Sequence, residues 1–113
     1  MEKIREFRFY KERFLSFYFD QSPKVQTKID YILDYIRFER EVPVKFFKKL
    51  VSTNGIYEVR VLTSEKSIRI LCYKEKEELI ILTDCFVKKS QKTPSKEIRL
   101  AEKLKKEYSH GKD

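Results

Sequence analysis

The chain has 113 residues, with 26 Lys and Arg against 18 Asp and Glu, and a formal net charge of +8. Its 41% hydrophobic and 14% aromatic content excludes a disordered basic tail and predicts one folded domain over residues 1–113 with one modest core. No apolar stretch approaches the roughly 18–20 residues that a membrane helix needs, so we expect no membrane partner.

Cysteine and histidine usage narrows the possible chemistry. Cys72 and Cys85 are too few for a disulfide framework, which favours a cytoplasmic protein kept reduced. A structural zinc site needs about four Cys or His ligands in paired spacing, and the one histidine, His110, lies near the end as a solvated tail residue. We therefore expect no metal and no cofactor. We also expect no thiolate chemistry, because apolar strand surroundings raise the pKa of a thiol.

The first third of the chain predicts a strand followed by two helices. Residues 3–10 alternate between two sides with a period of two, which is typical of a strand. Residues 14–18 carry aromatic and aliphatic side chains at spacings that suit one or two helical turns. Ser22-Pro23 supplies an N-cap and a proline at the first helical position. The helix predicted over Pro23–Glu39 has an apolar stripe made of Val25, Ile29, Ile32, Leu33 and Ile36.

The remainder predicts three strands and a final helix. Residues 56–62, 68–73 and 79–87 are rich in β-branched and apolar residues and are joined by short polar turns, which favours an antiparallel meander. The continuous apolar run in residues 79–87 predicts a central strand covered on both faces. A helix is expected from Thr93-Pro94 to about Tyr108, with residues 109–113 as a tail. These elements predict an α+β fold in which the helices pack on one face of the sheet.

The positive charge is concentrated near the C-terminal end. Residues 88–113 contain nine Lys and Arg against four Asp and Glu. The densest part is Lys88–Lys92, where the last strand leads toward a helix N-terminus, and Arg60 and Arg69 come from neighbouring strands. Lys-rich loops also serve solubility, and strand arginines often pair with a carboxylate such as Glu58. Two arginines facing a lysine loop across one sheet nevertheless favour a phosphate-binding site.

Four segments give the chain a resemblance to the RelE/ParE superfamily of toxins: residues 46–50, 55–61, 68–70 and 86–94. The last of them resembles the F-x-K-K-T-Q-K-T-P signature of the HigB-like branch, with Ser90 in place of the usual Thr. Asp84-Cys85 departs from the small or polar residues, such as Asn-Gly, that are common there. The resemblance covers about residues 3–108 and implies a RelE-like fold.

The resemblance also implies an activity and partners. Such a protein is the toxin of a type II toxin–antitoxin pair, acts as a ribosome-dependent mRNA endoribonuclease, and pairs with a helix-turn-helix antitoxin. Cleavage uses the 2′-hydroxyl of the RNA as nucleophile, without a metal. It needs a base for that hydroxyl, cations for the charge on phosphorus, and an acid for the leaving 5′-oxygen.

Residue roles carried over by position remain expectations. Arg69 matches the strand arginine used against the scissile phosphate, and Arg60 matches a basic position near it. Glu58, Lys89 or Lys92 would have to act as base or acid, and a lysine can act as base only if neighbouring cations lower its pKa. Further RNA-binding candidates are Lys48, Lys49, Lys88, Gln91 and Lys92. Two alternatives remain: a ParE-like toxin that inhibits DNA gyrase, and a non-catalytic RNA- or ribosome-binding module.

Overall fold

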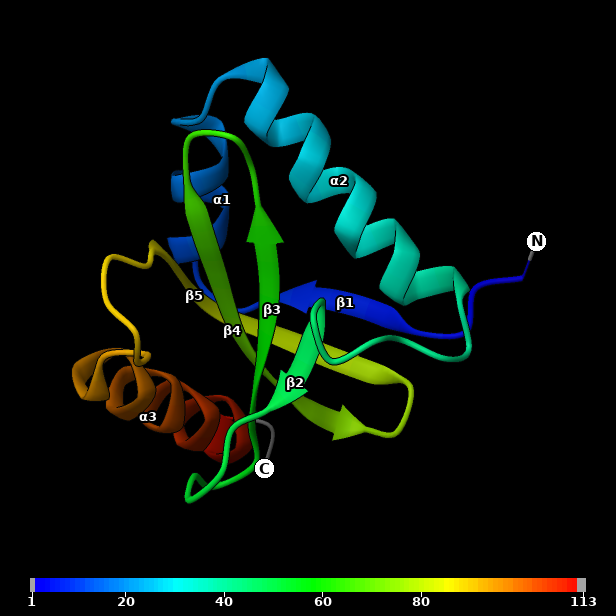
Figure 1. Cartoon of the computed structure of the whole chain (residues 1–113). Coiled ribbons are helices and arrows are strands. Elements are labelled where there is room, and N and C mark those ends of the chain that lie inside the picture. The colour runs from blue at the N-terminus through cyan, green and yellow to red at the C-terminus, as the bar shows by residue number, and fades with distance from the viewer. Residues whose placement is uncertain (1, 112–113) are drawn as a thin grey trace.

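The computed structural model describes residues 2–111 and shows, within them, one five-stranded mixed sheet with three helices (Figure 1). The strands are β1 (Glu6–Phe9), β2 (Phe47–Lys49), β3 (Ile56–Leu62), β4 (Ser67–Lys76) and β5 (Leu79–Val87). The helices are α1 (Arg13–Phe19), α2 (Pro23–Phe38) and α3 (Ser95–Gly111). The predicted α+β fold class, compatible with a RelE-like fold, is confirmed. No helix within residues 2–111 is long and apolar enough to cross a bilayer.

The sheet has the order β1-β5-β4-β3-β2. Strands β3, β4 and β5 form the predicted antiparallel meander, and β5 lies inside the sheet, as its apolar run indicates. Two features differ from the expectation. Strand β1 pairs with β5 in parallel, so the sheet is mixed, and the short strand β2 adds an antiparallel edge beside β3. Strand β2 has only three residues, two of them lysines, and is too short to show the alternation of apolar and polar residues that predicts a strand.

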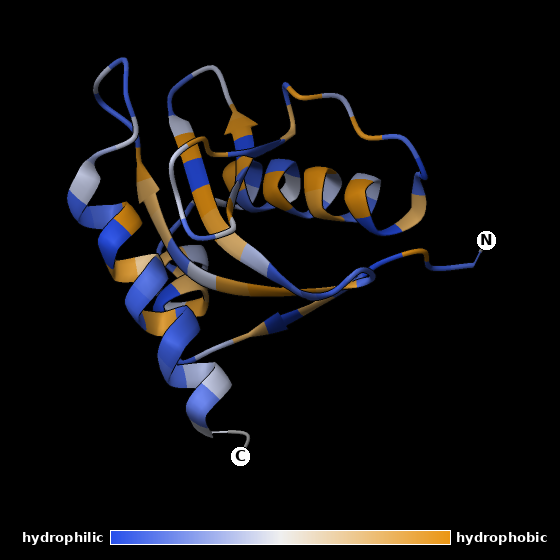
Figure 2. Cartoon of the chain, turned by 90° about the horizontal axis from the view of Figure 1, so that it is seen from below, coloured by the Kyte–Doolittle hydropathy of each residue, from blue (hydrophilic) through white to orange (hydrophobic). Residues whose placement is uncertain are grey.

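The helices lie on both faces of the sheet, whereas the sequence led us to expect them on one. Helices α1 and α2 cover a core that includes Val59, Ile70 and Leu82, and α3 covers a second cluster that includes Ile56, Leu71 and Ala101 (Figure 1). Consecutive residues of a strand point to opposite faces, so the continuous apolar runs of β4 and β5 need cover on both sides. Figure 2 shows hydrophobic residues along these strands and mixed hydrophilic and hydrophobic bands along α3.

Side-chain hydrogen bonds stabilise both ends of helix α2. The Ser22 side chain accepts a hydrogen bond from the Val25 backbone N–H at 3.3 Å, and Pro23 occupies the first turn. At the other end, the Arg5 guanidinium donates to the backbone carbonyls of Ile36, Glu39 and Arg40 at 2.8–3.0 Å. These bonds satisfy carbonyls that the helix itself leaves unpaired. The predicted stripe of α2 is buried throughout.

Helix α3 begins at Ser95 rather than at the predicted Thr93-Pro94 start. The Pro94 carbonyl accepts from the N–H groups of Glu97 and Ile98, so Pro94 takes the capping position. The helix continues to Gly111, so residues 109–111 of the expected tail are helical and His110 is exposed in the last turn, while residues 112–113 lie outside the described residues. Helix α3 also holds the β2–β3 turn, because Lys105 Nζ donates to the Asn54 carbonyl at 2.7 Å.

Candidate nucleic-acid interface

The α3 face of the sheet changes character along its strands. On β3, Ile56 belongs to the apolar cluster under α3, and Glu58 and Arg60 follow on the same face. Arg60 lies directly opposite Arg69 of β4 in the antiparallel register. Helix α3 begins only at Ser95 and covers Ile56, but it does not cover the part of this face that carries the two arginines. Both arginine side chains therefore remain partly exposed.

Glu58 is the centre of this region. Its side chain is fully buried, and Oε1 accepts a hydrogen bond from Arg60 Nε at 2.9 Å. Arg69 Nε lies 3.4 Å from the same oxygen, within ion-pair distance but without hydrogen-bond geometry. The Thr93 hydroxyl donates to Oε2. A buried carboxylate is costly unless it is paired and hydrogen-bonded, and these contacts meet that requirement. We call Glu58, Arg60, Arg69 and Thr93 the Glu58 group.

The two arginines differ in how much of each side chain reaches solvent. The Arg60 side chain is 29% exposed and the Arg69 side chain 12% exposed. Burial lowers the pKa of Arg69, the Glu58 carboxylate opposes that effect, and the positive charge of Arg60 adds to it. Arg69 also donates from Nη1 to the Ser67 hydroxyl at 3.0 Å and to the Ile68 carbonyl at 3.1 Å. Both guanidinium groups are therefore oriented before any ligand binds.

Two lysines complete a cation cluster around the arginines. Lys48 of β2 lies opposite Glu58 and so shares its face, and Lys88 continues the alternation of Phe86 onto the same face. Burial lowers the pKa of Lys88, followed by the positive charge of Arg69, with Glu58 acting in the opposite sense and Arg60 and Lys48 lowering it further. We call Lys48, Arg60, Arg69 and Lys88 the cation cluster.

A hollow of about 480 Å³ opens next to Arg69. It is lined by Ser67, Arg69, Lys88, Lys89, Ser90 and Gln91. The lining side chains are basic or neutral and polar, so the hollow suits an anion such as a phosphate group. The segment between β5 and α3 supplies four of the six lining residues.

The structure brings together most of the candidates named from the sequence, with two exceptions. Lys49 pairs with Tyr57 of β3 and therefore lies on the opposite face from Lys48 and Glu58. Lys92 is exposed and does not line the hollow. Thr93 is a site residue that the sequence did not reveal, because a Thr before Pro ahead of a helix reads as a cap. Ser90, the position at which the chain departs from the HigB-like signature, lines the hollow, and Ser67 does so without any signal in the sequence.

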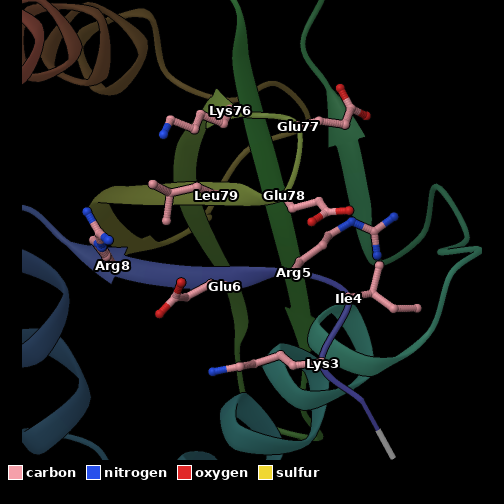
Figure 3. A pocket seen from close by; sticks show the side chains of 9 residues that line it. All are labelled: Lys3, Ile4, Arg5, Glu6, Arg8, Lys76, Glu77, Glu78 and Leu79. Atoms are coloured by element: carbon pink, nitrogen blue, oxygen red, sulfur yellow. The ribbon is translucent and has the colours of Figure 1, made fainter.

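A second hollow, beside strand β1, has a mixed charge. It is lined by four basic and three acidic side chains together with Ile4 and Leu79 (Figure 3). One of its basic residues, Arg5, is already hydrogen-bonded to the end of α2. This hollow therefore offers no concentration of free positive charge comparable to the cation cluster.

Neither thiol lies in surroundings that favour a thiolate. Burial raises the pKa of both Cys72 and Cys85, in line with the expectation from their apolar strands, and both are free. Among residues 2–111, no group of three or more His, Cys, Asp or Glu side chains is arranged to hold a metal ion.

Comparison with known proteins places the chain in a family. Residues 16–106 match the model of the family described as phage-derived protein Gp49-like (DUF891). The match runs from within α1 through most of α3 and includes every residue of the Glu58 group and of the cation cluster. No curated protein matches the chain. The chain therefore belongs to the Gp49-like family, whose members are RelE/HigB-like toxins of toxin–antitoxin systems.

Proposed function

We propose that this toxin is a ribosome-dependent endoribonuclease that cuts mRNA by attack of the RNA's own 2′-hydroxyl on the adjacent phosphate, without a metal ion. One observation carries the proposal: two arginines and two lysines from β2, β3, β4 and the end of β5 converge on one face of the sheet. Because the chain belongs to a family of toxins, we expect this surface to bind a target in the cell.

The arginines are suited to stabilise charge on the phosphate. In-line attack builds negative charge on the oxygens of the pentacovalent phosphorus, and preorganised cations lower the energy of that state. Arg60 and Arg69 are held by Glu58 before substrate binds, so little reorganisation is needed during the reaction. Arg60, the more exposed of the two, can reach the phosphate directly.

Lys88 takes the role of base in this proposal, in place of Lys89. A lysine accepts a proton only when its pKa is lowered, and Lys88 has that shift from burial and from Arg69, Arg60 and Lys48. Lys89 is exposed at the mouth of the same hollow, where its ammonium can donate a proton to the leaving 5′-oxygen. Glu58 is fully buried and already hydrogen-bonded, which suits a positioning role better than contact with RNA.

The ribosome would supply what this open surface lacks. The hollow is open and lined by polar side chains, which by themselves would hold a flexible RNA only loosely in the geometry for in-line attack. Binding in the ribosome would fix the mRNA and convert a loose encounter into an oriented one. The exposed lysines of residues 89–92 would contact rRNA or mRNA phosphates, so binding should weaken steeply with salt. A cognate antitoxin, which we expect to be of the helix-turn-helix type, would neutralise the same surface.

A reconstituted translation assay tests the proposal. Purified ribosomes carrying a defined mRNA are incubated with the toxin, and cut sites are mapped by primer extension. We expect wild-type cleavage, loss of at least about 100-fold for Arg69→Ala, and normal cleavage by Arg99→Ala, which removes the same charge from the exposed surface of α3. An mRNA with a single 2′-deoxy nucleotide at the cut site should resist cleavage.

Other outcomes would overturn the proposal. Intact mRNA on stalled ribosomes would indicate a non-catalytic ribosome-binding module. Intact mRNA together with inhibition of DNA gyrase would indicate a ParE-like toxin. Cleavage of the 2′-deoxy mRNA would exclude attack by the 2′-hydroxyl.

A further inference from the structure

We propose that Thr93 is a positioning residue that acts through Glu58 to hold Arg60 and Arg69 in the orientation needed for the scissile phosphate. The inference rests on the proposed function, since it assigns a role within the same site. Its structural part, the coupling of Thr93 to the two guanidinium groups, can be measured without any cleavage assay.

Three parts of the chain meet at the Glu58 carboxylate. Strand β3 contributes Glu58 and Arg60, β4 contributes Arg69, and the segment between β5 and α3 contributes Thr93, which is 35 residues from Glu58 in sequence. The arginines occupy Oε1, and Thr93 donates to Oε2. Thr93 is therefore the contact that fixes the second oxygen of the carboxylate.

Loss of the hydroxyl would disturb the arginines because Glu58 is fully buried. The Thr93 hydroxyl is the hydrogen-bond donor that the structure shows at Glu58 Oε2, so its removal would leave that oxygen without a donor among the described residues. A buried carboxylate oxygen without a donor is strongly disfavoured, so the carboxylate would turn toward a guanidinium or admit water. Either response moves the acceptor to which Arg60 Nε donates.

The orientation of Arg69 depends on the same carboxylate. Its Nε is buried and has no hydrogen-bond partner in the part of the chain that the structure describes, although it lies 3.4 Å from Glu58 Oε1. Among the hydrogen bonds made within residues 2–111, those of the Arg69 guanidinium come from Nη1, to Ser67 and to the Ile68 carbonyl. A change in the direction of the Glu58 carboxylate would thus be felt by both arginines.

The Thr93 hydroxyl is not needed to start α3. The helix begins at Ser95, and the Pro94 carbonyl accepts its first hydrogen bonds. A Thr93 variant should therefore leave the helix in place and act on the site. The neighbouring Ser95 is exposed and provides a matched control for removal of a hydroxyl.

The experiment compares Thr93→Val, Thr93→Ala, Thr93→Ser and Ser95→Ala in the full chain. The Nε–Hε NMR signals of Arg60 and Arg69 report the guanidinium environment, and they are assigned with Arg60→Lys and Arg69→Lys. Ribosome-dependent cleavage is measured at saturating toxin, and toxin–ribosome affinity is measured separately. Thr93→Ala accompanies Thr93→Val because it removes the hydroxyl without adding a methyl group beside the carboxylate.

We expect Thr93→Val and Thr93→Ala to move both arginine signals and to slow saturated cleavage about 10-fold or more, with affinity for the ribosome unchanged. Thr93→Ser should restore both readouts, and Ser95→Ala should match the wild type. Unchanged arginine signals in Thr93→Val and Thr93→Ala, or no rescue by Thr93→Ser, would overturn the inference. If the wild-type protein cleaves no mRNA, the proposed function fails, while the arginine signals still decide whether Thr93 acts through Glu58.

Discussion

Asp84 offers a test of stability that is independent of the cation cluster. This residue of β5 is only 3% exposed, and its Oδ1 lies 2.9 Å from the Thr83 hydroxyl. Oδ2 is buried, and no donor among the described residues reaches it. The Glu97 carboxyl in the first turn of α3 faces Asp84, and two carboxyl groups can hydrogen-bond only when one of them is protonated. Burial, followed by the hydrogen bond with Glu97, raises the pKa of Asp84 to about 7.

The size and sign of the effect follow from this pKa. A carboxyl that ionises at 3.8 in the unfolded chain and at about 7 in the fold binds its proton more tightly when folded. The stability that it contributes is full below pH 4, falls as the pH rises toward 7, and is then lost. At about 1.4 kcal/mol per pKa unit, the loss is at most about 4 kcal/mol. Asp84→Asn keeps a donor at every pH, so it should remove this dependence.

The assay is urea denaturation followed by circular dichroism between pH 4.5 and pH 8. We expect Asp84→Asn to exceed the wild-type free energy of unfolding by about 1 kcal/mol near pH 4.5 and by about 2–4 kcal/mol at pH 8. Asp20→Asn, which makes the same substitution at an exposed position, is the matched control and should change the free energy of unfolding by no more than about 0.5 kcal/mol. A constant difference between Asp84→Asn and the wild type across this range would refute the reasoning.

Three further predictions concern the site and the backbone. The cleavage rate should increase with pH through a midpoint below 10.5, because Lys88 must lose a proton to act as base and its pKa is lowered. In a series of cleavage assays at different pH values, Lys88→Arg should abolish this increase. An increase that persists in Lys88→Arg would exclude Lys88 as the base. Gly55→Ala should lower the free energy of unfolding by about 1–2 kcal/mol in urea, because Gly55 has a φ of 74° and an added Cβ would lie 2.9 Å from Lys105 Nζ. If Gly55→Ala were as stable as the wild type, the expected strain at this positive φ would be contradicted. Ser22→Ala should cost about 1 kcal/mol by the same measurement through loss of the α2 cap, and a neutral result would show that the cap adds nothing.

Much of the fold could be predicted because its signals are local. The Ser22-Pro23 start and the apolar stripe of α2 are features of a single helix, and β3 and β5 have the bounds that their β-branched runs indicate. The parallel pairing of β1 with β5 joins residues more than 70 positions apart, and no local pattern encodes it. The face of the sheet on which α3 packs likewise depends on tertiary contacts and not on a local pattern. The unbroken apolar run of β5 nevertheless indicates that both faces of the sheet must be covered.

The site was predictable to the level of strand alternation. The shared face of Arg60 and Arg69 follows from their positions in adjacent strands, and the register places them directly opposite each other. Strand alternation from Phe86 also places Lys88, and not Lys89, on the face of Arg69. The contact of Thr93 with Glu58 could not be predicted, because it depends on how the chain after β5 folds back over the sheet.

The pairing of β1 with β5 also governs the order in which the chain can fold during its own synthesis. Strand β1 is made before β5, its partner in the sheet, and the paired residues Glu6 and Leu79 are separated by more than 70 positions of the chain. Until β5 is made, the early aromatic residues of β1 have no strand to pair with, and the sheet cannot close. The segment that completes the cation cluster follows β5 directly, so the nascent chain carries no complete site until the residues after β5 have been translated.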